Sequence, residues 1–220
     1  MKFEINHGPS FASLHLDLDK GDQVRTEAGS MVAMSSDMNL STKAYGGLLR
    51  AIFRKLLGGE SVFMNTFTPG GDSGELVLSP TSPGEIRHIK LENGELVLQS
   101  SAYLASDPEI SLKTKYGGLK SMLSGEGLFL LSAKGTGDLW FNSYGNIVEV
   151  EVDGKYVVDT GHIVAFEPGL TFKTKKVGGL KATLFSGEGF VAEFTGKGKL
   201  YIQSRTLGSL VGWLTPMLPR

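Results

Sequence analysis

The chain has 220 residues, a formal net charge of −1 and no cysteine. The lack of cysteine excludes disulfides, thiol catalysis and cysteine-ligated zinc or iron–sulfur sites. A net charge near zero gives no overall attraction to nucleic acid or anionic lipid, so such a partner requires a local patch. With 40% hydrophobic residues the chain has a globular composition, which excludes general disorder.

The first twenty residues predict a pair of β-strands. Residues 1–9 alternate apolar and polar side chains and then reach a Gly-Pro turn, a pattern typical of a strand and unlike a secretory leader. In the next alternating run, His15, Asp17 and Asp19 share one strand face and are the best local candidates for metal ligands. A solvent-facing polar side is the favoured interpretation of that face. We therefore predict no metal site and keep a cupin-like metal enzyme as a minor alternative.

Three segments of the chain repeat one pattern. Each has a strand pattern, then a Gly-Gly pair beginning at Gly46, Gly117 or Gly178, then a Gly-Glu turn and an apolar run. The alignment also places Met31, Tyr103 and Ile163 at one position. The sequence thus predicts an all-β fold of three β repeats, as double-stranded β-helices or barrels, in one compact chain. Their boundaries are 1–79 with the N-terminal strand pair, 93–145 and 153–205, and residues 206–220 form a helical tail.

The short apolar runs inside each repeat are separated by glycine and Asx residues. Asn-Gly at 93–94 and Asp-Gly at 153–154 lie between such runs. Both central residues of a type I′ turn need a positive φ, which these dipeptides tolerate. The sequence therefore predicts hairpin turns at both places, and turn chemistry explains the 30 glycines.

Two segments have helical periodicity instead. Residues 48–57 are predicted to form a short inserted helix with an apolar face, which either covers a sheet or lies on a membrane. Residues 207–214 predict a short C-terminal helix, in a stretch without charge from Thr206 to Pro219. The expected oligomer or surface contacts on these two helices are Ile52, Phe53, Leu210, Trp213 and Leu214.

Lysines recur at corresponding positions of the three repeats. The candidate anion-binding residues are Lys43, Lys113, Lys115, Lys120, Lys173, Lys175 and Lys181. Such a concentration of positive charge can bind phosphate, nucleic acid or anionic lipid. A lysine-rich solvent face also protects sheet edges from aggregation, and this second interpretation is the favoured one.

The glycine-pair motifs, the segment Glu27–Val32, the segment Tyr156–Phe166 and the tail around Trp213 together resemble the altered-inheritance-of-mitochondria (mitochondrial biogenesis) family and its bacterial and archaeal relatives. The resemblance covers essentially the whole chain. It implies units similar to the tryptophan RNA-binding attenuation protein (TRAP), built as double-stranded β-helices, and it brings no catalytic residues, cofactor or ligand motif. Without a transit peptide, a cytoplasmic location is expected.

The function expected from the sequence is therefore that of a non-enzymatic β scaffold or binding protein. Its expected partner is itself, as a homo-oligomer, and no cofactor or small-molecule substrate is expected. The alternative is a nucleic-acid or anionic-lipid binder that uses the repeated lysines, in peripheral contact with a membrane or with nucleic acid.

Overall fold

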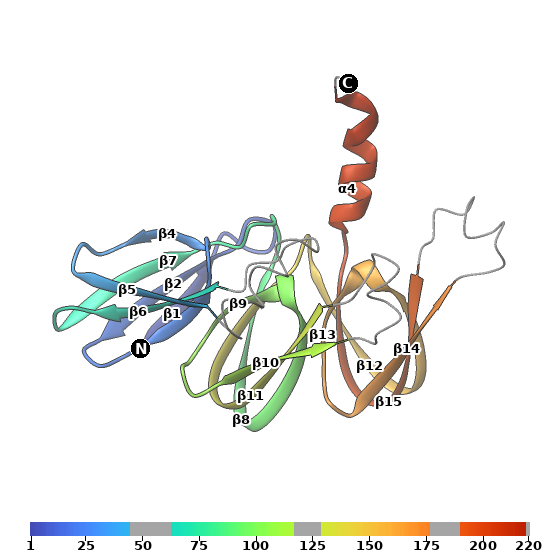
Figure 1. Ribbon diagram of the computed structural model, residues 1–220, viewed down its shortest axis with the longest axis horizontal. Helices are drawn as coiled ribbons and strands as arrows, with labels where there is room; N and C mark the ends of the chain where they lie inside the picture. Colours follow the sequence, from blue (N-terminus) through green and yellow to red (C-terminus); the bar gives the residue numbers. More distant parts are fainter. Residues whose placement is uncertain (45–62, 117–128, 177–189, 219–220) are drawn as a thin grey trace.

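The computed structural model describes residues 1–44, 63–116, 129–176 and 190–218, which form an almost entirely β structure (Figure 1). This confirms the all-β prediction. The strands are β1 (Lys2–Asn6), β2 (Ser13–Asp19), β3 (Val24–Glu27), β4 (Met31–Met34), β5 (Met38–Ala44), β6 (Phe63–Pro69), β7 (Ser73–Leu78), β8 (Ile86–Gln99), β9 (Tyr103–Ser106), β10 (Ser111–Tyr116), β11 (Phe129–Asn142), β12 (Ile147–Asp159), β13 (Ile163–Phe166), β14 (Leu170–Lys176) and β15 (Phe190–Gln203). The glycine pairs, the segment 48–57, Lys120 and Lys181 lie outside the described residues.

The strands lie in three groups along the long axis of the molecule (Figure 1). We call β1–β7 the N-terminal group, β8–β11 the middle group and β12–β15 the C-terminal group. One sheet has the order β1-β2-β7-β4. The other sheet continues through all three groups in the order β12-β15-β13-β8-β11-β9-β3-β6-β5, while β10 pairs with β11 and β14 with β15.

The short strands β4, β9 and β13 occupy corresponding places in the three groups. They begin at Met31, Tyr103 and Ile163, the positions that the sequence alignment equates. They pair antiparallel with β7, β11 and β15 respectively, and each pairing contains one irregularity near its start or middle. The 3₁₀ turns η1 (Ser100–Ala102) and η2 (Thr160–His162) precede β9 and β13 in the same way.

Each of these short strands is followed by a polar side chain that accepts a hydrogen bond from the neighbouring strand. The acceptor and donor atoms, all 2.8 Å apart, are Ser35 Oγ and Glu75 N, Asp107 Oδ2 and Asp138 N, and Glu167 Oε2 and Lys199 N. The backbone N–H of the same polar residue donates back to the carbonyl oxygen of its partner at 2.9–3.0 Å. The turn after each short strand is thereby fixed by the same two hydrogen bonds.

Backbone pairing joins one group to the next. β9 of the middle group pairs with β3, with Ala105 opposite Thr26. β13 of the C-terminal group pairs with β8, with Ala165 opposite Leu98. β9 and β13 therefore each pair within their own group and also form the boundary with the preceding one.

The apolar cores continue across these boundaries. The leucines of β2 and β7 pack with Leu104 and Trp140 of the middle group, and Val97 and Leu130 of the middle group pack with Phe194 of the C-terminal group. Trp140 and Phe194 are completely buried. Because burial of one large apolar side chain stabilises a fold by roughly 1.5–3 kcal/mol, these shared side chains tie the groups together.

The hairpin turns predicted at 93–94 and 153–154 are wrong. β8 and β12 each continue through the dipeptide as one strand. The glycines instead lie opposite glycines of the partner strand, Gly94 facing Gly135 and Gly154 facing Gly196. At Gly135, φ is 151° and an added Cβ would lie 2.5 Å from the carbonyl oxygen of Glu109. Glycine here allows a neighbouring loop to cross close to a long strand.

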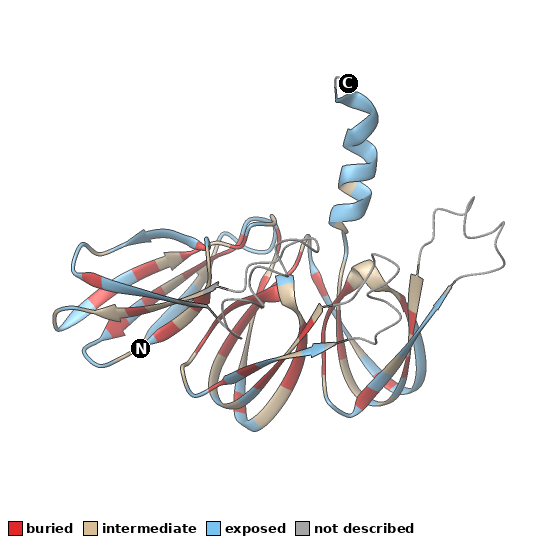
Figure 2. Ribbon diagram, in the orientation of Figure 1, coloured by how far each residue is buried: buried red, intermediate tan, exposed pale blue. Residues whose placement is uncertain are grey.

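A short helix follows the last strand, as predicted. α4 (Leu207–Leu214) begins at Thr206, whose hydroxyl accepts a hydrogen bond from Ser209 N at 3.1 Å, and continues into η3 (Thr215–Met217). It projects away from the β-strands in Figure 1, and Figure 2 shows it as exposed along nearly its whole length. Within the described part of the chain, no helix has the length and apolar character needed to cross a membrane.

The crossing at Gly135 gives a test of the fold. Gly135→Ala is expected to lower the free energy of unfolding by about 1–3 kcal/mol, because a methyl group would meet the Glu109 carbonyl and strain the positive φ. Gly212→Ala is the matched control, since no atom outside the backbone of α4 and the neighbouring residues lies within 4 Å of the added methyl group. Urea unfolding curves measure both changes, and equal midpoints for the two variants would contradict the close crossing.

Candidate functional site

A charged cleft lies where the middle group meets the C-terminal group. Its volume is about 330 Å³, near the lower end of the roughly 300–1,000 Å³ range of small-molecule sites. β8 forms one wall, and β12 with β15 forms the other. The lining residues are Arg87, His88, Ile89, Leu91, Glu95, Leu96, Glu149, Glu167, Lys199 and Tyr201.

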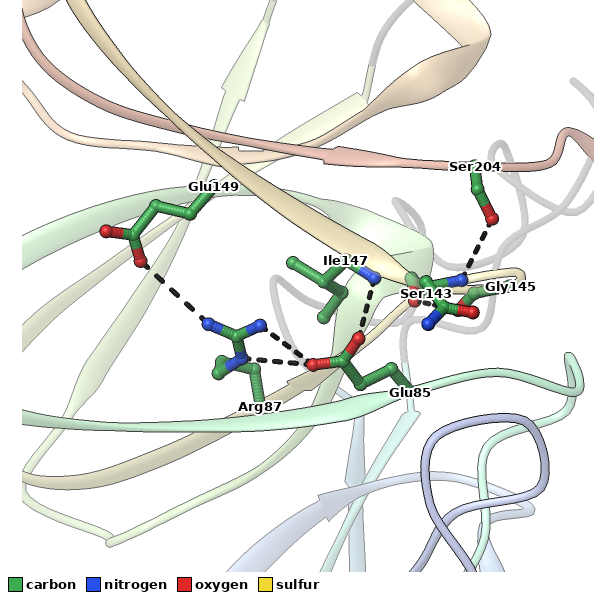
Figure 3. Close-up of polar contacts among 8 residues, drawn as sticks. Glu85, Arg87, Ser143, Gly145, Ile147, Glu149 and Ser204 are labelled. Atoms are coloured by element: carbon green, nitrogen blue, oxygen red, sulfur yellow. Dashed lines mark hydrogen bonds and ion pairs between the residues drawn. The ribbon is translucent and has the colours of Figure 1, made fainter.

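Alternating charges connect the two walls of the cleft. Arg87 Nη2 lies 2.8 Å from Glu85 Oε1 on its own wall, and Nη1 lies 3.9 Å from Glu149 Oε2 on β12 (Figure 3). The other carboxylate oxygen of Glu149 lies 2.8 Å from Lys199 Nζ on β15. The positive charges of two cations thus offset the negative charges of two carboxylates where the middle and C-terminal groups meet.

Glu85 is the most buried member of this row and anchors it to the backbone. Its side chain is 19% exposed, and Oε2 accepts a hydrogen bond from Ile147 N at 2.8 Å (Figure 3). The backbone N–H of Glu85 also donates to the carbonyl oxygen of Gly145 at 3.0 Å. Glu85 thus holds the first residue of β12 and the connection that leads to it.

The surroundings of the cleft raise the pKa values of two of its residues. The hydrogen bond from Lys199 to Glu149 raises the pKa of the lysine, which keeps it protonated. Burial raises the pKa of the Tyr201 phenol, and the negative charge of Glu149 adds to this effect. Both groups therefore hold their protons at neutral pH. The cleft is lined by ion pairs, of which the one between Arg87 and Glu149 joins the two walls.

His88 lies at the edge of the same cleft. Its Nε2 is 2.8 Å from Asp138 Oδ1, and its ring packs 4.5 Å from the ring of Phe3, measured between centroids. Across the described ranges, no three His, Asp or Glu side chains gather in a metal-binding arrangement. His15, the metal-ligand candidate on β2, lies with its Nε2 3.0 Å from the hydroxyl of Ser13.

The described lysines of the predicted anion set lie on strands of different groups. Lys113 and Lys115 are exposed on β10, and Lys173 and Lys175 are exposed on β14. Lys43 is the sixth residue of β5, in the N-terminal group. Among the described strands, β10 pairs only with β11, β14 only with β15 and β5 only with β6. The lysines therefore lie along three separate sheet edges.

Lys115 and Lys175 are neutralised by carboxylates. Lys115 Nζ forms an ion pair with Glu95, whose second partner is the hydroxyl of Ser132 at 2.7 Å. Lys175 Nζ lies 2.6 Å from Glu193, and Lys155 lies on the other oxygen of that carboxylate at 3.9 Å. These contacts support the edge-protecting interpretation of both lysines.

The ion pair with Lys115 changes the pKa of Glu95. The hydrogen bond from Lys115 lowers the pKa of Glu95 below its ordinary value, and the hydrogen bond from Ser132 lowers it further. Glu95 therefore stabilises the folded chain in its ionised form.

The predicted contact residues of the tail are accessible. Trp213 is 61% exposed and Leu214 is 38% exposed, while Leu210 is partly exposed. Ile52 and Phe53 lie outside the described residues. The structure therefore leaves the apolar side chains of α4 free for a contact, and the contact itself stays a prediction.

The cleft was not predicted from the sequence. Glu85 and Arg87 lie far in the chain from Glu149, and Lys199 lies far from all three. The pairing of β12 with β15 brings Lys199 to Glu149, and the pairing of β8 with β13 brings the C-terminal group beside Arg87. A usable signal existed for the hydrogen-bonded turns, because Ser35, Asp107 and Glu167 each lie four residues after an aligned strand start.

Comparisons with known proteins agree with each other. The model of the mitochondrial biogenesis AIM24 family matches residues 3–205. An uncharacterised protein of Streptococcus pyogenes serotype M6 is 33% identical over 228 aligned positions, which cover 100% of this chain and 92% of that protein. A crystal structure of a protein from Streptococcus pyogenes, 32% identical, superposes with a TM-score of 0.82 over 99% of both chains.

The titration of Glu95 predicts a pH-dependent effect. Lys115→Gln should lower the free energy of unfolding by about 0.5 kcal/mol at pH 7, a small effect because half of the lysine side chain is exposed to screening by water. A carboxyl group with a depressed pKa in the folded state stabilises above its unfolded pKa, and the effect is lost as pH falls through the folded value. The difference should therefore shrink as the pH falls and vanish once Glu95 is protonated in the folded chain as well as in the unfolded chain.

Urea unfolding at pH 7 and at low pH checks this prediction. Lys113→Gln is the matched control, because Lys113 lies on the same face of β10 and makes no ion pair with the described residues. A loss of stability in Lys115→Gln that is equally large at both pH values would contradict the assigned ion pair.

Proposed function

Since the chain belongs to the mitochondrial biogenesis AIM24 family, we propose that it is a non-enzymatic β scaffold that associates with further copies of itself. The scaffold consists of three TRAP-like units, one in each strand group. The observation that carries the proposal is the exposed apolar helix α4, which follows the last strand.

α4 has the character of a segment that is buried in a larger assembly. Val211 is 58% exposed and Trp213 is 61% exposed, and no charged residue occurs from Thr206 to Pro219. None of the residues of α4 is buried. A helix that is apolar around its circumference is normally enclosed on several sides, and large apolar patches on a protein surface mark contact sites.

A second copy is the favoured cover for this helix. The apolar cores of the described residues are formed by side chains of the strand groups and contain no residue of α4. α4 also extends away from the strands instead of lying against them (Figure 1). Docking on a neighbouring copy buries these side chains without a change in the β-strands.

The proposal of three TRAP-like units draws support from the repeated backbone contacts. The short strand, the hydrogen-bonded turn after it and the strand that pairs with it recur in each group with the same register. Such recurrence is expected when one supersecondary unit is repeated and its neighbours bury a continuous core.

An anion-binding role of the lysines has less support. Lys115 and Lys175 already face carboxylates, so a phosphate group would have to compete with Glu95 and Glu193. The lysines also lie along separate edges, where they would meet an extended ligand only in part.

Truncation after Arg205 tests the proposed contact of α4. The truncated chain should show a lower mass by light scattering than the full chain at equal concentration, with an unchanged far-ultraviolet strand signal. Ser209→Ala is the control within the helix, because it removes a hydroxyl group and keeps the apolar side chains. An unchanged mass after truncation would contradict the proposal, and binding of the full chain but not of the truncated chain to neutral lipid vesicles would assign α4 to a lipid surface instead.

A further inference from the structure

Three corresponding strands differ sharply in burial. Every residue of β9 and of β13 is buried, whereas every residue of β4 is exposed (Figure 2). Val32 of β4 is 61% exposed, while Leu104 and Val164 at the corresponding positions are 0% and 1% exposed. The difference does not come from composition, because all four side chains of β4 are apolar.

The difference comes from the second edge of each strand. β9 pairs with β11 on one side and β3 on the other, and β13 pairs with β15 and β8. β4 pairs with β7, and no strand in the described ranges pairs with its other edge. β4 thus lacks the neighbour that its two counterparts have in the preceding group.

The register of the two internal contacts is identical. Ala105 and Ser106 of β9 lie opposite Thr26 and Arg25 of β3. The corresponding residues of β13, Ala165 and Phe166, lie opposite Leu98 and Val97 of β8. In both cases the short strand pairs with the strand that comes directly before the short strand of the preceding group. β3 comes before β4, and β8 comes before β9.

β12 of the C-terminal group corresponds to β3 and β8, and among the described residues no short strand pairs with its end. η2 follows β12 as η1 follows β8, which equates Val157 and Val158 with Val97 and Leu98. Val97 is 3% exposed beneath β13, whereas Val157 is 56% exposed. β12 pairs with β15, and its other edge meets no strand of the described residues.

Charge distribution sets these two edges apart from the others. Exposed sheet edges are normally protected from association by charged side chains. β1, β10 and β14 carry lysines or glutamates along their lengths. β4 has no charged residue. β12 has none over residues 156–158, which correspond to the part of β8 that pairs with β13.

We propose that β4 of one copy pairs antiparallel with the end of β12 of a second copy, with Ala33 opposite Val158 and Met34 opposite Val157. This register continues the one that joins the groups within a chain. The contact is head to tail, so a pair of copies still has one free β4 and one free end of β12, and the assembly closes into a ring or extends as a filament. The inference rests on the proposed self-association and adds a contact that is independent of α4.

Disulfide trapping tests the register directly, because the chain has no cysteine of its own. Directly opposed residues of an antiparallel pair bring their Cβ atoms within about 4.5–5.5 Å, close to disulfide geometry. Under mild oxidation, the variant with Met34→Cys and Val157→Cys should give a ladder of covalent multimers that reduction removes. The matched control combines Met34→Cys with Val148→Cys. Val148 lies on β12 and is 47% exposed, but it is not opposite β4 in the proposed register, so this variant should stay a single covalent chain under oxidation.

The single variants decide the polarity of the contact. An equal mixture of the Met34→Cys chain and the Val157→Cys chain should give covalent dimers that contain one of each and no longer products. Dimers of Met34→Cys alone, or a ladder as strong in the Val148→Cys control, would overturn the proposed pairing. So would the absence of a ladder in a doubly substituted chain that keeps its far-ultraviolet strand signal.

The tail-truncated chain separates this inference from the proposed role of α4. The double cysteine variant truncated after Arg205 should still give the ladder, because β4 and β12 are unchanged. If truncation leaves the mass of the protein unchanged while the ladder forms, the role of α4 fails and the strand pairing stands. If truncation lowers the mass and no ladder forms in either length, the strand pairing fails and the role of α4 stands.

Discussion

The structure depends on one backbone contact, the antiparallel pairing of a short strand with the preceding group. β9 makes this contact with β3, and β13 makes it with β8. Both pairings use two residues of the accepting strand, and both bury apolar side chains from two groups at once. Because the hydrogen bonds fix the register, the side chains on either side of each boundary meet in a defined order. The charged cleft is one result, since Arg87 reaches Glu149 only when β13 lies beside β8.

A chain built in this way has two unlike ends. The interior contacts satisfy β9 and β13, while β4 and the end of β12 keep apolar, exposed edges. α4 adds a further apolar surface beyond the last strand. Ion pairs occupy the cleft and neutralise Lys115 and Lys175, while the exposed side chains of β4 and α4 are apolar. This distribution supports the proposed scaffold role for this member of the AIM24 family, with a second copy as the proposed partner.

The parts of the fold that could be predicted are those encoded locally. Alternation in the N-terminal strands, the aligned starts at Met31, Tyr103 and Ile163, and the apolar period of the tail each depend on nearby residues. The hairpins at 93–94 and 153–154 were wrong because a positive φ at Asn93, 52°, serves a bend inside a long strand as readily as a turn. The lysine partners and the cleft depend on residues distant in sequence. Only the pairing of strands could reveal that Glu95 neutralises Lys115.

Amide hydrogen exchange measured over a range of protein concentrations tests the central claim most directly. Pairing between copies protects backbone amides that are open in a single chain, whereas pairing within a chain is independent of concentration. Peptides that cover β4 and residues 156–158 should therefore exchange more slowly as concentration rises, while peptides that cover β9 and β13 stay equally protected throughout. Exchange in β4 and in residues 156–158 that is fast and the same at every concentration would contradict the account.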